Sequence, residues 1–259
     1  MGRLPATVAA IASDRRSGAR EIARAAAEAL AGLDPETVPD AVRALLRGHP
    51  AMAPLWRLAT AVLEAPDPAA GASRFLELLR RDDRVPEAAA PLLPDAVLTI
   101  SWSSTVVAAL RLRRPRSVLC MVSEPGGEGR RTAEALAELG ARAIPDEEAL
   151  AAFPAEAAVV GADAVGPGGL VNKVRTGALC RAARGRGLPA MALAGETKLL
   201  SADLPAPGPF ERVPLGLLDA VVLPEGPVGA AEAARRAGAA RLHPSLAPLL
   251  EELRRAHPG

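Results

Sequence analysis

The sequence predicts an α/β protein in which an N-terminal helical domain is followed by a domain built on a parallel β-sheet. Up to about residue 85, apolar side chains recur at helical spacing, as at Ile22, Ala26 and Leu30. After residue 95, short continuous apolar runs alternate with helical stretches, which is typical of parallel strands covered on both faces. We therefore expect a helical domain over 1–85, a connection over 86–94 and an α/β domain over 95–259.

The helical domain is predicted to contain several amphipathic helices that are separated by prolines. Ser17 can cap one of them, with Glu21 in its first turn. His49 falls between two helices, and because the nearby sequence offers no metal partner we interpret it as a solvated loop residue without a role. Further helices are expected over residues 38–47, 53–64 and 69–81.

The α/β domain is predicted to contain six strands with helices between them. The expected strands cover residues 96–100, 117–122, 141–144, 157–160, 190–194 and 219–223. The expected helices cover residues 104–112, 129–139 and 174–183, with two more over 228–256 that pack on the sheet or on a partner. No Gly-x-Gly-x-x-Gly follows the first strand, so the usual dinucleotide fingerprint is missing.

Composition excludes some classes of function. The formal net charge is +1, and with no tyrosine, three phenylalanines and two tryptophans there is little on which bases could stack, so we expect no nucleic-acid partner. The start of the chain lacks the features of a secretory signal, and no charge-free apolar stretch is long enough for a membrane span. We expect a cytoplasmic protein, with Cys120 and Cys180 as buried, inert thiols rather than reactive ones.

Polar residues follow the predicted strands at the edge of the sheet where ligands bind in α/β proteins. They are Ser101, Ser103, Ser104, Ser123, Glu124, Asp163, Glu196, Thr197, Lys198 and Glu225. Asn172 is the only asparagine, and Lys173 and Lys198 are the only lysines beside 29 arginines. We expect 161–169 to be a loop and Asn172 to begin a helix, so that an ammonium and helix amides form a site for an anion.

Each candidate residue also has a purely structural interpretation. Asp163 could cap its own turn, and Lys173 could be an ordinary lysine on a helix surface. Glu124 precedes a glycine-rich segment and could be a solvated acid in a loop. The basic run 111–116 is best explained as solvated charge at the end of a helix.

Four motifs, taken in order along the chain, resemble those of the initiation factor 2B-like family. They are Val97-Leu98-Thr99-Ile100-Ser101-Trp102-Ser103-Ser104, Gly161-Ala162-Asp163 with Asn172-Lys173, Ala194-Gly195-Glu196-Thr197-Lys198, and Phe210-Glu211-Arg212-Val213-Pro214. The family includes regulatory subunits of a translation factor's nucleotide exchanger, methylthioribose-1-phosphate isomerase and ribose-1,5-bisphosphate isomerase. The resemblance implies a Rossmann-like second domain through which the protein forms a homodimer.

The resemblance also implies roles for individual residues. Asp163 matches an aspartate that carries proton chemistry in the family's isomerases, and Asn172 and Lys173 match a pair that contacts the phosphorylated sugar. Ser101 stands where those isomerases have a cysteine, and a hydroxyl is a poorer proton acceptor than a thiol. Two arginines that could bind phosphate in the isomerases are also replaced, although Arg16 or Arg130 could substitute for them.

The sequence thus leaves two functions open. The first is binding of a phosphorylated sugar or nucleotide, with aldose–ketose isomerisation if the protein is an enzyme. Asp163 would be the general acid or base, Ser101 a hydrogen-bond donor, and Asn172, Lys173, Glu124 and Lys198 would bind the substrate. No metal or other cofactor is implied. The second function is a non-catalytic regulatory or scaffold protein that resembles the translation-factor subunits.

Overall fold

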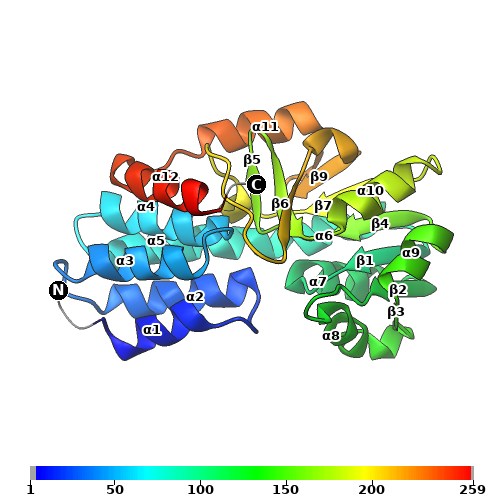
Figure 1. Ribbon diagram of the computed structural model, residues 1–259, viewed down its shortest axis with the longest axis horizontal. Helices are drawn as coiled ribbons and strands as arrows, with labels where there is room; N and C mark the ends of the chain where they lie inside the picture. Colours follow the sequence, from blue (N-terminus) through cyan, green and yellow to red (C-terminus); the bar gives the residue numbers. More distant parts are fainter. Residues whose placement is uncertain (1–3, 258–259) are drawn as a thin grey trace.

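The computed structural model describes residues 4–257, which form a helical part and a sheet part side by side (Figure 1). The five N-terminal helices make up most of the helical part. They are α1 (Ala6–Ser13), α2 (Ala19–Ala31), α3 (Val38–Gly48), α4 (Ala53–Glu64) and α5 (Pro68–Arg81). Their buried faces enclose a core in which Trp56 and Phe75 are the largest side chains. The predicted helical periodicity therefore arises from burial of one apolar stripe on each helix.

The first turns of α5 and α2 differ in whether a side chain accepts a hydrogen bond from the free backbone N–H groups. The Asp67 carboxylate accepts a hydrogen bond of 2.8 Å from the Ala70 amide and caps α5, while proline follows it at the first helical position. The predicted cap at Ser17 is wrong, because α2 begins after Gly18 and no side chain caps it. The Ser17 amide instead donates to the Asp14 carboxylate, which stabilises the preceding turn.

The segment between the two parts is helical rather than extended. It consists of η1 (Asp82–Arg84), α6 (Val85–Ala89) and η2 (Ala90–Leu92). Val85 and Ala89 are buried against the sheet part, so this segment belongs to a core as well as joining the two parts. The domain division at residues 86–94 stays a prediction.

A seven-stranded sheet forms the centre of the second part, with the strand order β10-β9-β7-β4-β1-β2-β3. All neighbouring strands are parallel except β10, which pairs antiparallel with β9. The strands are β1 (Ala96–Ile100), β2 (Ser117–Met121), β3 (Arg142–Ile144), β4 (Ala157–Val160), β7 (Ala190–Leu193), β9 (Ala220–Leu223) and β10 (Gly226–Val228). After β1 the next strands are added on one side of it, as β2 and β3, whereas after β4 they are added on the other side, as β7 and β9. The point at which the strand order reverses therefore lies between the adjacent strands β1 and β4.

Helices cover both faces of this sheet, as the continuous apolar strands predict. On one face Val97 and Cys120 pack against α6, α7 and α8, and on the other Leu98 and Met121 pack toward α9, α10 and α11. Alternate residues of one strand thus enter two different cores. The helices are α7 (Ser104–Arg113), α8 (Glu128–Ala135), α9 (Asp146–Ala152), α10 (Thr176–Arg184) and α11 (Ala230–Ala239), with short turns η3 (Ala137–Leu139), η4 (Glu196–Lys198) and η5 (Leu215–Leu217).

A second, antiparallel sheet was not predicted and corrects the interpretation of the segment after Asp163. It contains β5 (Ala164–Gly166), β6 (Gly169–Lys173) and β8 (Phe210–Val213). Asn172 and Lys173 therefore end a strand, and helix α10 begins only at Thr176. The Asp203 carboxylate accepts a hydrogen bond of 2.9 Å from the Gly168 amide and holds the tight turn between β5 and β6.

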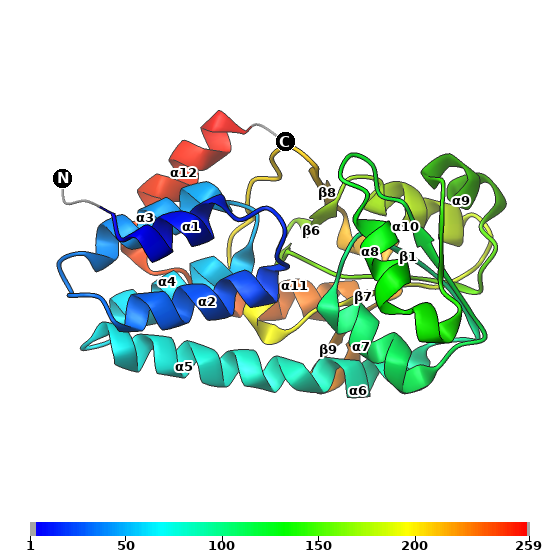
Figure 2. The same cartoon turned by 90° about the horizontal axis from the view of Figure 1, so that it is seen from below.

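The C-terminal helix returns to the helical part. Figure 2 shows α12 (Ala247–Ala256), which follows η6 (Pro244–Leu246), beside α3 and α4 and away from the large sheet. Leu249, Leu250 and Leu253 of α12 belong to the same core as the N-terminal helices. The expectation of two helices over 228–256 is thus met by α11 and α12, of which the second packs on the helical part rather than on the large sheet.

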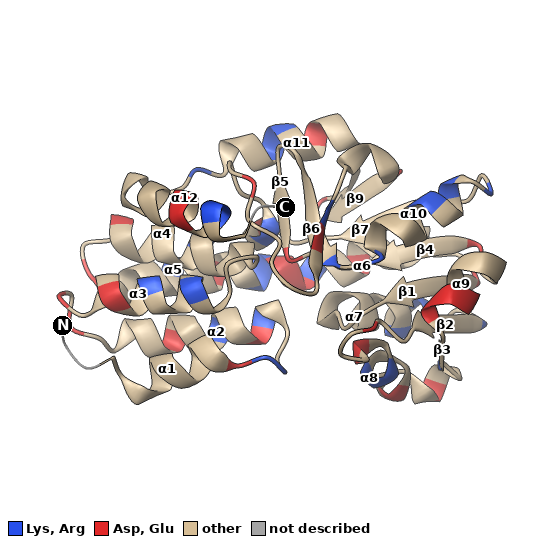
Figure 3. Cartoon of the chain, in the orientation of Figure 1, with Lys and Arg blue, Asp and Glu red and all other residues tan. Residues whose placement is uncertain are grey.

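Charged side chains of both signs are interspersed over the two parts, in keeping with the small net charge (Figure 3). Within residues 4–257, no helix is both long enough and apolar enough to cross a bilayer.

Candidate functional site

Two adjoining cavities lie where the helical part meets the carboxyl ends of β1 and β4. This is the point of topological reversal, at which ligands bind in open α/β sheets. The larger cavity has a volume of about 450 Å³ and the smaller, which we call the recess, about 40 Å³. Gly18, Ala19, Trp102 and Asp163 line both, so the recess continues the larger cavity toward the interior.

The larger cavity is rich in cationic side chains, most of them from the helical part and one from α8. Arg15, Arg16, Arg47 and Arg131 line it, together with two histidines. Acidic side chains are fewer and sit mainly on the side of the sheet. The other ionisable residues that line this cavity are Asp14, His49, Glu128, Asp163, Lys173 and His257. Cationic side chains outnumber acidic ones in this cavity, which favours the binding of an anion.

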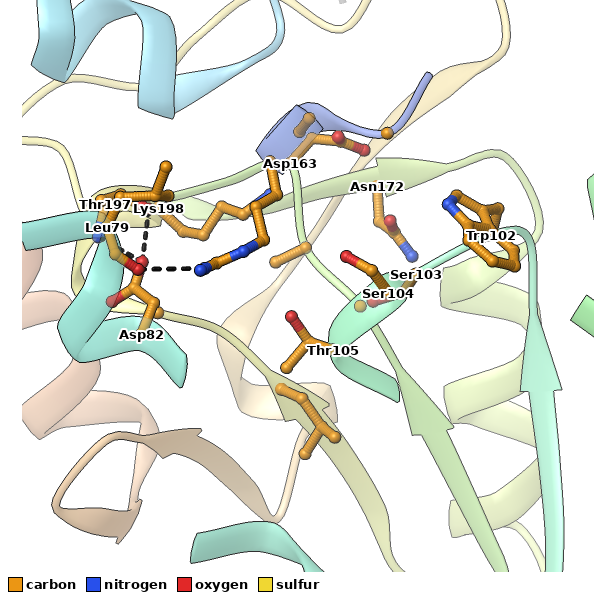
Figure 4. Close-up of a pocket in the computed structure, with 17 residues that line it drawn as sticks. Leu79, Asp82, Trp102, Ser103, Ser104, Thr105, Asp163, Asn172, Thr197 and Lys198 are labelled. Carbon is orange, nitrogen blue, oxygen red and sulfur yellow. Dashed lines mark hydrogen bonds between the residues drawn. The ribbon is translucent and has the colours of Figure 1, made fainter. Parts of the chain in front are cut away.

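The recess is polar and small. Figure 4 shows hydroxyl, amide and carboxyl groups from the ends of the strands around it, with Lys198 approaching from the opposite side. Its polar lining consists of Arg20, Asp82, Ser103, Ser104, Thr105, Asp163, Asn172, Thr197 and Lys198. A volume of this size accommodates one or two non-hydrogen atoms of a ligand whose remainder occupies the larger cavity.

Among the described residues, Asp163 is the only acid that lines both cavities. Its main chain is fixed on two sides, since its amide donates to the Val171 carbonyl at 2.9 Å and its carbonyl accepts from Ala53 at the start of α4 at 2.9 Å. No described residue donates a hydrogen bond to its carboxyl group, so it does not cap its own turn. Burial raises the pKa of Asp163, and Lys198 acts in the opposite direction.

Lys198 faces Asp163 across the recess. Burial lowers the pKa of Lys198, while the charges of Asp163, Asp82 and Glu21 act in the opposite direction. Within the described part of the chain, its ammonium group forms no hydrogen bond or ion pair. The turn that carries it is anchored by Asp82, whose carboxylate accepts hydrogen bonds from the Glu196 amide at 2.7 Å and the Thr197 hydroxyl at 2.5 Å.

Ser101 follows β1 in a left-handed backbone conformation, with φ of 62°. Two hydrogen bonds of 2.7 Å maintain it, because its amide donates to the Ser123 hydroxyl and its carbonyl accepts from the Thr132 hydroxyl. A non-glycine residue in this conformation carries a backbone cost that the surrounding contacts offset. Ser101 lines the larger cavity with Asp163, whereas Asn172 lines the recess.

Lys173 lies in the larger cavity, but its charge is already paired. Its Nζ donates to both carboxylate oxygens of Glu128 at 2.8 Å and also to the Pro125 carbonyl, and only 3% of its side chain is exposed. Asn172 is buried beside it and donates to the Thr176 hydroxyl at 3.1 Å. Because both residues are on a strand, the predicted helix amides do not surround them.

Glu124 lines neither cavity. Its side chain is 57% exposed and lies 3.5 Å from Arg130, so it matches the interpretation as a solvated loop acid. The acid that reaches the cavity from this segment is Glu128, at the start of α8. Glycines over 126–127 with φ of 117° and 72° reverse the chain between the two acids.

Sequence reasoning missed several residues of the cavity wall. The interpretation of His49 as solvated is wrong, because it is 5% exposed and its Nε2 lies 2.7 Å from the Ile11 carbonyl oxygen.

Arg131 stacks on Trp102, with the guanidinium carbon 3.8 Å from the ring centroid, and donates to the Arg16 carbonyl at 2.8 Å. The Trp102 indole Nε1 is buried and has no partner among residues 4–257.

Other reactive side chains lie away from the cavities. Cys120 and Cys180 are buried in the two cores that flank the large sheet, and burial raises the pKa of each thiol to about 12. A thiol with this pKa is almost entirely protonated at neutral pH and is a poor nucleophile. Residues 4–257 contain no cluster of three or more His, Cys, Asp or Glu side chains arranged to hold a metal ion.

Comparison with known proteins identifies relatives of this chain. The model of the initiation factor 2 subunit family matches residues 70–204, which is more than half of the sequence and includes Asp163, Lys173 and Lys198. No curated protein matches the chain significantly.

Solved structures share the fold at low sequence identity. Translation initiation factor eIF-2B of Pyrococcus horikoshii OT3 is 24% identical with a TM-score of 0.75, and the match covers 87% of this chain and 98% of that one. A chain of the tetrameric eIF2B-beta2-delta2 complex from C. thermophilum is 19% identical with a TM-score of 0.71, covering 90% and 93%. The 5-methylthioribose 1-phosphate isomerase of P. horikoshii OT3 is 20% identical with a TM-score of 0.64, covering 95% and 87%.

Proposed function

Because the chain belongs to the initiation factor 2 subunit family, we propose that it binds a phosphorylated sugar in the two adjoining cavities and interconverts its aldose and ketose forms. The observation that carries this proposal is the position of Asp163, which lines both cavities and whose carboxyl group receives no hydrogen bond from any residue in 4–257. An isomerase and translation-factor subunits both occur among the structures that share the fold.

The phosphate is proposed to bind in the larger cavity. Arg15, Arg16 and Arg131 line it from two elements, and guanidinium groups bind phosphate oxygens through paired N–H donors. Lys173 is less suited to this role than its position suggests, because Glu128 neutralises its ammonium. We therefore assign the anion to the arginines and treat Lys173 as a residue that positions α8 against β6.

The reacting carbons are proposed to lie at the recess beside Asp163. Aldose–ketose isomerisation removes a proton from the carbon next to a carbonyl group and returns one to the former carbonyl carbon. A carboxyl group can carry out this exchange by accepting the first proton and returning it, and burial raises the pKa of Asp163 and so strengthens it as the proton acceptor. The Lys198 side chain and the Ser101 hydroxyl would donate hydrogen bonds to the oxygen on which negative charge develops.

A regulatory protein remains the second candidate, and two observations favour it. Ser101 supplies a hydroxyl where a stronger proton acceptor would serve catalysis better, and the charge of Lys173 is cancelled by Glu128. The similar chain from C. thermophilum belongs to a tetrameric complex. In either case we propose a cytoplasmic protein that forms a homodimer through residues 95–259.

Isotope exchange tests the proposed reaction directly. The protein would be incubated in D₂O with ribose-1,5-bisphosphate, methylthioribose-1-phosphate and pentose 5-phosphates, and the sugars followed by proton and phosphorus NMR. An isomerase gives a ketose phosphate from one of them, with deuterium incorporated on carbon where solvent exchanges with the transferred proton. A raised melting temperature without any conversion favours the regulatory protein. If the sugars are not converted and do not raise the melting temperature, binding of a phosphorylated sugar is contradicted for both functions.

A further inference from the structure

The amine of Lys198 differs from that of Lys173 in its hydrogen-bond and ion-pair partners. The Lys173 ammonium is held by Glu128 and by the Pro125 carbonyl, with 3% of its side chain exposed. The Lys198 ammonium has no partner in the described part of the chain, and it lines a cavity that a ligand can enter. An unpaired amine beside an open site is the arrangement that nucleophilic catalysis by lysine requires.

We propose that Lys198 captures a phosphorylated aldehyde as an imine, a covalent reactivity additional to the isomerisation proposed above. The recess admits a carbonyl group, and the rest of a short aldehyde extends into the larger cavity, where its phosphate meets Arg16 and Arg131. This inference rests on the proposed function only in using the same phosphate site.

Asp163 supplies the acid that imine formation needs. The neutral amine attacks the carbonyl carbon, the C–N bond forms, and one of the two protons on nitrogen passes to the former carbonyl oxygen to give a carbinolamine. Asp163 then donates a proton to that hydroxyl group, which leaves as water, and the proton lost from nitrogen returns to Asp163. The sum is amine plus aldehyde giving imine plus water, with no oxidant, reductant or further reactant.

The surroundings of Lys198 shift its pKa in the direction that imine formation needs. Burial lowers the pKa of Lys198, and Arg20, which lines the same recess, acts in the same direction. Asp163, Asp82 and Glu21 oppose the shift, but burial is the larger effect. A lowered pKa increases the share of the neutral amine, which is the form that attacks a carbonyl carbon.

The chain is well suited to a test, because it contains only two lysines. The full-length protein would be treated with glyceraldehyde 3-phosphate and sodium cyanoborohydride, which reduces an imine to a stable secondary amine. Peptide mass spectrometry then locates the adduct and separates it from any reaction at the α-amino group. We expect modification of Lys198 at least about ten times faster than that of Lys173.

Two variants sharpen the comparison. Lys198→Arg keeps the positive charge but removes the nucleophile, and it should lose the adduct while circular dichroism confirms that it is folded. Arg80→Lys places a reference amine at an exposed position, where the original side chain is 68% exposed. At low aldehyde concentration the amine at position 198 should outcompete the one at position 80, and glyceraldehyde without phosphate should reduce its advantage.

The outcomes separate this inference from the proposed function. Equal labelling at positions 80 and 198, or none at 198 in the folded protein, overturns the imine. If sugar phosphates still raise the melting temperature or are converted, the proposed function stands without it. Selective labelling of Lys198 with no conversion of any sugar phosphate supports the imine and counts against the isomerase.

Discussion

Asp82, at the end of α5, accepts a hydrogen bond of 2.5 Å from the Thr197 hydroxyl and so ties the helical part to the turn that carries Lys198. The same carboxylate accepts the Glu196 and Thr197 amides at 2.7 and 3.3 Å. Gly195 permits this approach, because a Cβ atom there would lie 2.0 Å from the Asp82 carboxyl carbon. Burial raises the pKa of Asp82 although these three donors oppose the shift.

Asp82→Ala should therefore destabilise the fold strongly. It leaves two amides and a hydroxyl buried without an acceptor, and we expect the free energy of unfolding to fall by about 3 kcal/mol. Asp83→Ala is the matched control, because Asp83 is 60% exposed and its pairing with Arg20 contributes at most about 1 kcal/mol. Urea unfolding of the two variants measures both values, and similar losses would contradict a special role for Asp82.

Glu128→Gln should separate stability from anion binding. Removing this carboxylate leaves the Lys173 ammonium buried without its counter-charge, so we expect a loss of about 3 kcal/mol in the free energy of unfolding. The freed positive charge should also tighten binding of inorganic phosphate, measured by titration calorimetry. Glu124→Gln is the control, since this exposed carboxylate should change stability by no more than about 0.5 kcal/mol.

Asp163→Asn should change how stability depends on pH. Burial raises the folded-state pKa of Asp163 above the ordinary value of 3.8, so between the two pKa values the folded protein holds a proton that the unfolded chain has lost. The contribution of Asp163 to stability therefore falls as pH rises through this window. Urea unfolding at pH 4, 5 and 6 should show Asp163→Asn gaining stability relative to the natural protein with each step. A constant difference would mean that the pKa is not raised.

Ser101 offers a direct test of the isomerase against the regulatory protein. If the site is catalytic, Ser101→Cys should accelerate conversion of the sugar phosphate, because a thiol exchanges protons more readily near neutral pH than a hydroxyl does. Ser101→Ala should slow conversion without changing the left-handed backbone. Ser101→Gly relieves the backbone cost at φ 62° and should stabilise the fold by up to about 1 kcal/mol. No activity in any of the three would favour the regulatory protein.

The large sheet was predictable because its signals are local. Buried parallel strands are short apolar runs, and those of β1 and β4 agree with the predicted bounds. The small sheet could not be predicted in this way, because β6 pairs with β8 about 40 residues later and no local sequence pattern indicates that pairing. This omission placed Asn172 and Lys173 on a helix instead of a strand.

The site was predictable to the extent that strand order brings residues together. Asp163, Asn172 and Lys198 meet because each follows or flanks an element at the same sheet edge. Glu128 and Lys173 could not be paired from the sequence, because their contact spans 45 residues and depends on a turn at the glycines. The arginines of the larger cavity could not be singled out from the sequence, because the chain contains 29 arginines and most of them lie on the surface.

The last helix of the chain completes the first core. Leu250 and Leu253 of α12 lie among side chains of α2, α3 and α4, more than 180 residues earlier in the sequence. During synthesis on the ribosome, the N-terminal helices would thus expose an apolar surface until residues 247–256 have emerged.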